Sequence, residues 1–394
     1  MNSPAPAFLS GLEPFNAERV PEIVDDLLET ARHRGASDIH IVPTETALEV
    51  SWRIDGVLQH VGKFPRQFSV NLVARLKVLS ELLTYQTEIP QEGRIRSGDN
   101  TLDMRVSTFP TLFGEKAVVR LLRTSDQLLQ IDQLGFTPRI HQQLSAALNR
   151  RSGALIVAGP AGSGKTTTLY ACLRELAGKH DQPASLASLE DPIESVIQGV
   201  AQSQLNPGAG FDYATGLRSL MRQDPEVIMV GEIRDQETAE TVLQASLTGH
   251  LVLTTFHAGS GTEAIGRLSD MGIEPHLLRS GLVAILSQRL LRRRCHCEPM
   301  ADRVGSPGTH PDPLPNCPRC LGTGYSGRQV IAEWLDPSEP IIARGILEKH
   351  DSHSLHSAAV ESGHLDLADA ASRAVQAGWT TLEEVIRVLG LPAT

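Results

Sequence analysis

The chain lacks any long hydrophobic run: no stretch of its 394 residues approaches the roughly 18 consecutive apolar residues of a membrane span. The first residues, Met1-Asn2-Ser3-Pro4, also lack the charged and apolar regions of a secretory signal peptide. These two absences predict a cytosolic protein. Cysteine is scarce as well, and five cysteines in a long cytosolic chain are expected to be metal ligands or buried thiols rather than a disulfide framework.

Basic residues are also fewer than acidic ones. Asp and Glu number 46 against 36 Lys and Arg, which gives a formal net charge of −10. An acidic protein repels a phosphate backbone, so no direct nucleic-acid partner is expected. The basic run Arg292-Arg293-Arg294 is either a local docking point or a solvated helix end.

The chain does have an ordinary globular composition, with 41% hydrophobic and 21% charged residues. This composition can fill a core, and it excludes the disordered and fibrous classes. A length of 394 residues predicts two or three domains.

The N-terminal part predicts a flexible lead over residues 1–18 and a small α+β domain over residues 19–125. The lead is rich in Pro and Ala and has no period. In the domain, apolar residues recur at helical spacing or alternate as in strands, and Asp55-Gly56 is typical of a hairpin turn. The expected elements are a helix over 20–34, strands on both sides of the turn, a helix over 72–83 and a strand over 102–107.

From about residue 130 the pattern changes to strands separated by helices, which predicts a parallel sheet with helices on both faces. This domain is expected over residues 130–291, with strands at 154–158, 185–189, 227–230 and 251–255. Residues 292–330 are loop-rich and hold four of the cysteines, and residues 331–394 are expected to contain two short amphipathic helices after Ile341.

One motif predicts nucleotide binding. Gly159-Pro160-Ala161-Gly162-Ser163-Gly164-Lys165-Thr166 matches the phosphate-loop pattern G-x-x-x-x-G-K-[ST] at every specified position. Glycines let successive backbone N–H groups curl around phosphate oxygens, Lys165 supplies a charge, and Thr166 supplies a hydroxyl for Mg²⁺. A strand enters the loop and a helix over 166–176 leaves it, so the helix N-terminus faces the phosphates of ATP. The expected binding segment runs from Gly159 to Thr167.

Hydrolysis needs carboxylates that hold Mg²⁺ and orient water at the ends of neighbouring strands. Two acidic clusters fit this requirement. The segment from Glu226 to Glu232 is an apolar strand that ends in a carboxylate, the form of a Walker B element. The segment Glu190-Asp191-Pro192-Ile193-Glu194 follows the preceding strand. Both clusters after a phosphate loop favour an ATPase.

Several further motifs resemble the ATPases that drive type II secretion and type IV pilus assembly. The resemblance covers nearly the whole chain from about residue 20. It implies an α/β protein with a P-loop NTPase (RecA-like) core, preceded by a small α+β domain and followed by a Cys-containing subdomain and C-terminal helices. The matching segments are 248–257 for the histidine box, 222–225 and 231–235 for the Walker B region, and 36–40, 53–56, 91–95 and 103–108 for the family's second N-terminal domain.

The resemblance also implies roles for the acidic residues. Thr166 and Glu232 are expected to hold Mg²⁺, and Glu194 is expected to activate the attacking water. The family's acidic box holds two glutamates, so Glu190 remains an alternative for either task.

Two histidines and two arginines complete the expected site. His250 and His257 flank a strand and are expected to sense the γ-phosphate, to hold an interface, or to be buried and satisfied by neighbours. Arg94 and Arg105 match family positions that reach the nucleotide, where guanidinium groups stabilise developing charge. A structural salt bridge is the alternative for each arginine.

The pairs Cys295-His296-Cys297 and Cys317-Pro318-Arg319-Cys320 predict a structural Zn²⁺ site with four thiolate ligands. Family members often carry four cysteines here, usually as two C-x-x-C pairs, so the first pair of this chain is shortened. His296 or His310 are alternative ligands, and unliganded buried thiols are the alternative to a metal. Cys172 is expected in the core.

The resemblance implies a cytoplasmic motor, peripheral at the inner face of the cytoplasmic membrane, that hydrolyses ATP and moves an inner-membrane platform protein. A homo-oligomer is expected, a hexamer in the family's usual arrangement. The cysteines favour secretion or pilus extension over retraction. The chain starts close to the family's second N-terminal domain, so an additional docking domain is expected to be absent. The alternatives are a nucleotide-binding scaffold without turnover, a pilus-retraction or DNA-uptake motor and, most remotely, a small-molecule kinase.

Overall fold

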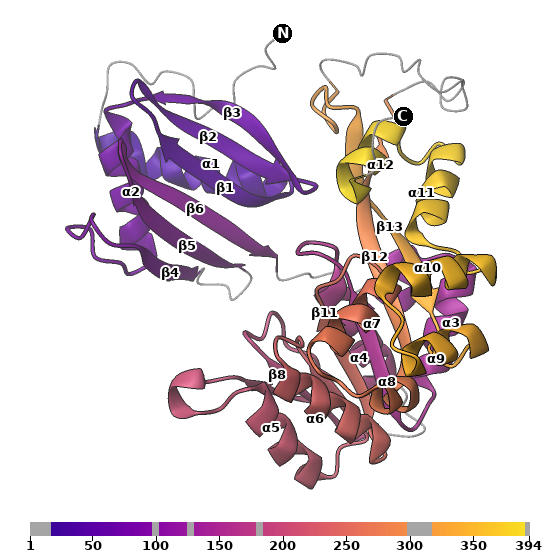
Figure 1. Ribbon diagram of the computed structural model, residues 1–394. Coiled ribbons are helices and arrows are strands. Elements are labelled where there is room, and N and C mark those ends of the chain that lie inside the picture. The colour runs from indigo at the N-terminus through magenta and orange to yellow at the C-terminus, as the bar shows by residue number, and fades with distance from the viewer. Residues whose placement is uncertain (1–16, 97–101, 124–129, 179–183, 298–316, 391–394) are drawn as a thin grey trace. The chain divides into compact units, whose positions relative to one another are not determined.

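The computed structural model describes residues 17–96, 102–123, 130–178, 184–297 and 317–390 (Figure 1). The chain divides into two compact units: the first is built on residues up to Asp126 with a short later segment that ends at Gly327, and the second on the other described residues from Gln127 onward. Each unit has its own sheet. Most of the predicted lead lies outside the described residues, and Ala17–Arg19 forms a short 3-10 helix, η2.

The first unit is a six-stranded antiparallel sheet with two helices on one face (Figure 1). Buried residues of both helices share one hydrophobic core with the inward-facing strand residues, so none of the helices described in this unit covers the other face of the sheet. The strand order is β3-β2-β1-β6-β5-β4. The elements are α1 (Val20–His33), β1 (Ala36–Pro43), β2 (Ala47–Ile54), β3 (Val57–Pro65), α2 (Phe68–Leu79), β4 (Gln91–Arg96), β5 (Leu102–Thr111) and β6 (Gly114–Arg123).

The predicted hairpin is present, and the predicted length of the second helix is wrong. Asp55 and Gly56 join β2 to β3 with φ of 49° and 82°, the left-handed pair that a two-residue hairpin turn requires. Helix α2 ends at Leu79 and does not continue to Leu83, whose side chain is exposed. Glu81 takes a φ of 59°, which a continuing helix does not allow.

The second unit contains a seven-stranded sheet in the order β13-β12-β7-β11-β10-β8-β9, in which every pair from β12 to β9 is parallel. Helices cover both of its faces, as the sequence predicts: α3 and α4 pack on one and α5 to α8 on the other (Figure 1). The strands are β7 (Gly153–Ala158), β8 (Leu186–Glu190), β9 (Val200–Gln204), β10 (Val227–Val230), β11 (Leu251–Phe256), β12 (Leu282–Arg294) and β13 (Tyr325–Leu335). The helices are α3 (Pro138–Leu148), α4 (Lys165–Ala177), α5 (Tyr213–Leu220), α6 (Gln236–Leu247), α7 (Gly261–Asp270) and α8 (Pro275–Gly281).

The four predicted strands match β7, β8, β10 and β11 to within one residue, whereas β12 and β13 were not expected from the sequence. Strand β12 crosses the predicted boundary between residues 291 and 292, and β13 crosses the one between residues 330 and 331. Both strands belong to the sheet that holds the phosphate loop. The charged end of β12 resembles a loop in sequence because consecutive arginines usually indicate exposure to solvent. Here Arg292 and Arg294 instead contact other parts of the protein.

Four helices, rather than the expected two, follow β13: α9 (Pro340–Leu347), α10 (Ser352–Glu361), α11 (Leu367–Gln376) and α12 (Leu382–Leu389). The last three have the N-cap residues Asp351, Asp366 and Thr381, whose side chains accept a backbone N–H of the first turn. These short helices were overlooked because each buries only a few residues. Among the described helices, none has the length and apolar content that crossing a membrane requires.

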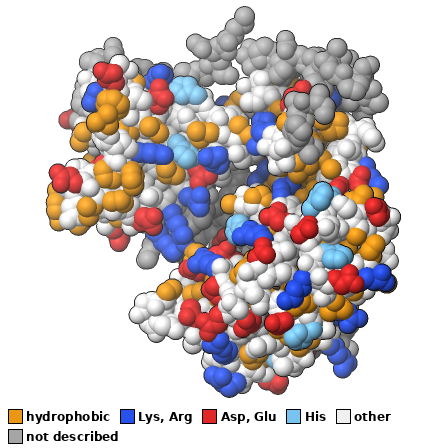
Figure 2. Space-filling view, in the orientation of Figure 1, with side chains coloured by type: hydrophobic (Ala, Val, Ile, Leu, Met, Phe, Trp, Pro, Cys, Tyr) orange, Lys and Arg blue, Asp and Glu red, His pale blue; other side chains and the backbone are white. Residues whose placement is uncertain are grey.

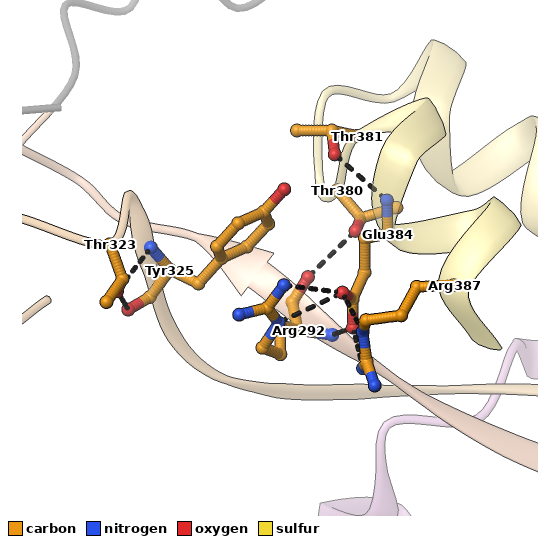
Figure 3. A network of polar contacts seen from close by, with 7 residues as sticks. All are labelled: Arg292, Thr323, Tyr325, Thr380, Thr381, Glu384 and Arg387. Carbon is orange, nitrogen blue, oxygen red and sulfur yellow. Dashed lines mark hydrogen bonds and ion pairs between the residues drawn. The ribbon is translucent and has the colours of Figure 1, made fainter. Parts of the chain in front are cut away.

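A buried carboxylate fastens α12 to β12 (Figure 3). Glu384 is 1% exposed and accepts hydrogen bonds from the backbone N and Nε of Arg292, each at 2.9 Å, and from Nε and Nη2 of Arg387 at 2.7 and 2.6 Å. Arg294 is also buried, and its backbone N–H donates to the carbonyl of Trp379. The basic run is therefore neither a helix end nor a solvated patch, since only Arg293 is exposed. On the face of the second unit that Figure 2 shows, acidic and basic side chains are interspersed.

Candidate nucleotide site

The predicted motifs of the second unit meet at one edge of the parallel sheet. Strands β7, β11, β10 and β8 are neighbours, so their carboxyl ends lie together. Backbone hydrogen bonds join the segments that follow them: the N–H of Gly159 donates to Phe256, and the N–H of Gly231 donates to Leu189. The phosphate loop, Glu232, His257 and the 190–194 segment therefore leave the sheet side by side.

The phosphate loop requires glycine at two points. Gly159 has a φ of 155°, and a Cβ there would lie 2.4 Å from Ser163 Oγ and 2.8 Å from the carbonyl oxygen of Gln288. Gly164 has a φ of 89° and is the N-cap of α4. Because α4 begins at Lys165, the free N–H groups of its first turn point into the loop. The site therefore has the form of an anion cradle.

Lys165 lies over this cradle and is 8% exposed. Its Nζ donates to the carbonyl oxygens of Gly159 and Pro160 at 2.9 and 3.0 Å. Burial lowers the pKa of Lys165, and the negative charge of Glu232 opposes that shift. A phosphate group in the loop would replace the two neutral acceptors with an anion and favour the charged lysine.

Gln288 is a buried residue of this region that sequence reasoning missed. Its Nε2 donates to the carbonyl oxygen of Ser163 at 2.8 Å, and its Oε1 accepts from the hydroxyl of Thr168 at 2.9 Å. The side chain thus ties β12 to both the loop and α4. A single glutamine within a strand belongs to no motif, so no sequence pattern indicates its role.

Glu232 connects the segments that follow β10, β11 and β8. Its Oε1 lies 2.5 Å from Nη2 of Arg234, and its Oε2 lies 3.4 Å from Nε2 of His257. Arg234 also contacts Asp191 Oδ2 at 3.2 Å through Nη1. Thr166, the second residue of α4, is half-buried. Carboxylate and hydroxyl oxygens are the ligands that Mg²⁺ prefers, so the donor set of Glu232 and Thr166 fits that ion.

Burial distinguishes the two glutamates of the acidic box. Glu190 ends β8, is 3% exposed, and accepts hydrogen bonds from the hydroxyls of Tyr170 and Ser188 and from Nε2 of Gln202. Glu194 is exposed, and its backbone N–H donates to the hydroxyl of Tyr170 at 3.1 Å. Glu190 is therefore enclosed by the protein, whereas the side chain of Glu194 is accessible to water.

The two histidines lie at opposite ends of β11. His257 follows the carboxyl end and contacts Glu232. His250 precedes the amino end, about 20 Å away along a six-residue strand, and its Nδ1 lies 3.0 Å from the carbonyl oxygen of Ala245. The structure therefore brings His257, and not His250, to the phosphate loop of its own chain.

The arginines of the first unit form a row across its sheet. The strand registers place Arg94 opposite Arg105, Arg105 opposite Arg120, Arg120 opposite Asp38, and Asp38 opposite Arg53. The flanking residues on these strands are buried in the core, so the row lies on the face without helices. Arg120 and Arg53 contact Asp38 at 3.0 and 3.6 Å.

This row is electrostatically unbalanced. Like charges directly opposite on neighbouring strands repel, and the row holds four arginines for one aspartate. The Nε of Arg105 is buried, and no described residue accepts its hydrogen. Burial and the positive charge of Arg53 lower the pKa of His40 on the same face. These features make the row a candidate anion-binding surface.

The four predicted zinc ligands converge. The sulfur atoms of Cys295, Cys297, Cys317 and Cys320 all lie within 4.8 Å of one another. Four thiols at this spacing fit a tetrahedral Zn²⁺ ion with Zn–S bonds of about 2.3 Å. After the second pair, Leu321 and Gly322 take positive φ, which turns the chain tightly around the cluster. His296 is not part of the cluster, and His310 lies outside the described residues.

Comparison with known proteins agrees with these motifs. The family model described as "Type II/IV secretion system protein" matches residues 15–387. The type II secretion system protein E of Klebsiella pneumoniae is 40% identical over 381 residues, which is 94% of this chain and 76% of that protein. The type II secretion system ATPase E of Vibrio cholerae is 40% identical over 397 residues, which is 96% of this chain and 76% of the relative.

A solved structure of the pilus retraction motor PilT with bound ADP is similar in fold, with a TM-score of 0.63 and 25% identity; the match covers 92% of this chain and 95% of PilT. It supports the α/β assignment, with a parallel sheet in the second unit. The chain therefore belongs to the type II/IV secretion system protein family, the secretion ATPases that its motifs resemble.

Proposed function

We propose that this protein is the ATP-hydrolysing motor of a type II secretion or type IV pilus assembly system. The observation that carries the proposal is the convergence, at one sheet edge, of the phosphate loop with Glu232, His257 and the 190–194 segment. An anion cradle beside carboxylates that suit Mg²⁺ and water is the arrangement that phosphoryl transfer to water requires.

In this proposal the segment from Gly159 to Thr167 binds the phosphates of ATP, and Thr166 and Glu232 hold Mg²⁺, which neutralises developing charge on the phosphate oxygens. Glu194 is assigned to the attacking water, because its side chain is exposed while Glu190 is enclosed by three hydrogen-bond donors. His257, through its contact with Glu232, senses the occupied site.

The arginine row supplies a second set of contacts. Arg94 and Arg105 are assigned to the nucleotide, because the row has an excess of positive charge and an unmet donor at Arg105. Guanidinium groups stabilise the charge that spreads over the phosphoryl oxygens in the transition state. Binding and release of ATP would then move the first unit against the second, and this motion would act on an inner-membrane platform protein.

Zinc, oligomeric state and location complete the proposal. The cysteine cluster holds one structural Zn²⁺ that fixes the connection between β12 and β13. The active form is a homo-oligomer, proposed as a hexamer, at the cytoplasmic face of the inner membrane. The cysteines favour secretion or pilus extension over retraction. A metal analysis of the purified protein with well under one zinc per chain would remove the zinc assignment.

ATP turnover measured against protein concentration tests the motor, with mass from light scattering as the parallel readout and Lys165→Ala as the blank. We expect turnover to rise steeply as the larger assembly forms, and Lys165→Ala to lose at least about 10³-fold. Glu194→Gln should keep its affinity for ATP and lose most of its turnover. Binding of ATP without turnover at any concentration would instead identify a nucleotide-binding scaffold.

A further inference from the structure

Tyr170 connects the phosphate-loop helix to the acidic box. It lies on α4, five residues after Lys165, and is 4% exposed. Its hydroxyl donates to Glu190 and accepts the backbone N–H groups of Glu194 and Ser195, at 3.1 and 3.5 Å. One donated and two accepted hydrogen bonds use the full capacity of a hydroxyl group. The contact is therefore complete, and a phenylalanine would lose all of it.

Glu190 and Gln202 extend this hydrogen-bond network along the segment that follows β8. Besides Tyr170, Glu190 accepts from Ser188 Oγ at 2.7 Å and from Gln202 Nε2 at 2.9 Å. Gln202 Nε2 also donates to the carbonyl oxygen of Ser195 at 3.0 Å, and its Oε1 accepts the N–H of Ile197 at 2.7 Å. Tyr170 and Gln202 together hold four backbone groups between residues 194 and 197.

The direction of the Tyr170 hydrogen bonds is fixed by its protonation. Burial, and then the hydrogen bond to the Glu190 carboxylate, raise the pKa of Tyr170 far above its ordinary value. The phenol therefore keeps its proton across the physiological range. The phenol donates this O–H in a hydrogen bond to Glu190, so the lone pairs of its oxygen can accept the backbone N–H groups of Glu194 and Ser195.

We propose that Tyr170 is a positioning residue for ATP hydrolysis: with Glu190, it fixes the backbone at Glu194 and Ser195 to the helix that begins at the phosphate loop. This inference rests on the proposed function, in which Glu194 acts on the attacking water. Displacement of such a group by about 1 Å can cost about 10²-fold in rate, so the anchor matters even though it does not touch ATP.

Tyr170→Phe tests the anchor first without reference to turnover. Amide hydrogen exchange in the full-length protein should become faster by at least about tenfold in a peptide covering residues 191–197, because the N–H groups of Glu194 and Ser195 lose their acceptor. A peptide from α5 should exchange as in the unchanged protein. Unaltered exchange at 191–197 would overturn the proposal, as would an equal increase in α5, which indicates general loosening.

Kinetics provide the second test. Tyr170→Phe should lower kcat about 10- to 100-fold and leave the KM for ATP within about twofold, because the phosphate loop is intact. Glu190→Gln should produce the same pattern. Tyr85→Phe, which removes a hydroxyl that is 76% exposed in the first unit, is the matched control with unchanged kcat. A normal kcat in Tyr170→Phe, or a loss confined to KM, would contradict the assignment.

The double variant separates this inference from the proposed function. If Tyr170 acts through Glu194, then adding Tyr170→Phe to Glu194→Gln should cause no further loss of kcat. Full turnover in Glu194→Gln would refute the proposed role of Glu194 itself. Loss of turnover in Glu194→Gln together with an additional, multiplicative loss in the double variant would refute only the role of Tyr170.

Discussion

The two sheets of this protein present functional residues in different ways. The antiparallel sheet of the first unit packs helices on one face only and places a row of arginines across the other. The parallel sheet of the second unit is covered on both faces, so its chemistry lies at the carboxyl ends of the strands. A face positions charges by strand register, whereas an edge positions them by the loops that follow the strands.

The largest expected effect tests whether the arginine row of the first unit contributes to ATP hydrolysis. Arg105→Ala should lower ATP turnover about 10²-fold while nucleotide affinity stays nearly the same, because a guanidinium that stabilises transition-state charge contributes mainly to the rate. Lys116→Ala is the matched control, since Lys116 lies on the same face of β6 but outside the row. Turnover is measured by phosphate release. Equal turnover in the two variants would show that Arg105 does not contribute to hydrolysis.

The next effect concerns the attachment of α12 to the parallel sheet. Burial alone would raise the pKa of Glu384, but hydrogen bonds from Arg387 and Arg292 lower it below its ordinary value. A lowered pKa stabilises the fold above the unfolded-state value of about 4.5, and this stability is lost as pH falls through the folded-state pKa. The effect should therefore be complete at neutral pH and fade in acid.

Glu384→Gln measures that contribution. Breaking a buried ion pair typically costs about 3–5 kcal/mol, but Arg387 is 41% exposed and water can solvate it, so we expect about 2 kcal/mol at pH 7. Urea unfolding followed by tryptophan fluorescence reports it through Trp334 and Trp379 of the second unit. A difference from the unchanged protein that shows no decline as the pH is lowered from 7 through the acid range would show that the carboxylate charge is not the cause.

The smallest effect tests the balance of the arginine row. Asp38→Asn removes the only carboxylate of the row, and we expect a loss of about 1 kcal/mol, since Arg120 and Arg53 are 65% and 37% exposed and water screens them. Fluorescence of Trp52 follows the first unit. At about 1 M salt the loss should shrink, because the Debye length falls to about 3 Å. A loss independent of salt would indicate a packing defect instead.

The sequence predicted the edge better than the face. The phosphate loop and the two acidic clusters are contiguous motifs next to apolar strands, so their place in the fold could be predicted from the sequence. The arginine row joins residues of five strands, and only the register of the paired sheet reveals that Arg94, Arg105 and Arg120 stand in line. Gln288 and Tyr170 were not predicted because their importance lies in contacts between distant segments.

Long-range hydrogen bonds also explain the elements that were missed. The end of β12 looked like a charged loop because nothing in the sequence shows that Glu384, some ninety residues later, receives Arg292. The sequence likewise does not show that Glu190 is buried and Glu194 exposed. His250 and His257 both flank β11 in sequence, yet His250 lies at the end of the strand opposite to the phosphate loop.

Strand β12 connects several functional regions of the second unit. It is 13 residues long; Gln288 near its middle holds the phosphate loop, Arg292 holds α12, and Cys295 follows its last residue. From Gln288 to Cys295 the strand spans about 23 Å and is close to full extension. One continuous strand therefore connects the phosphate loop, the cysteine cluster and the C-terminal helices, so these three regions share a single structural support.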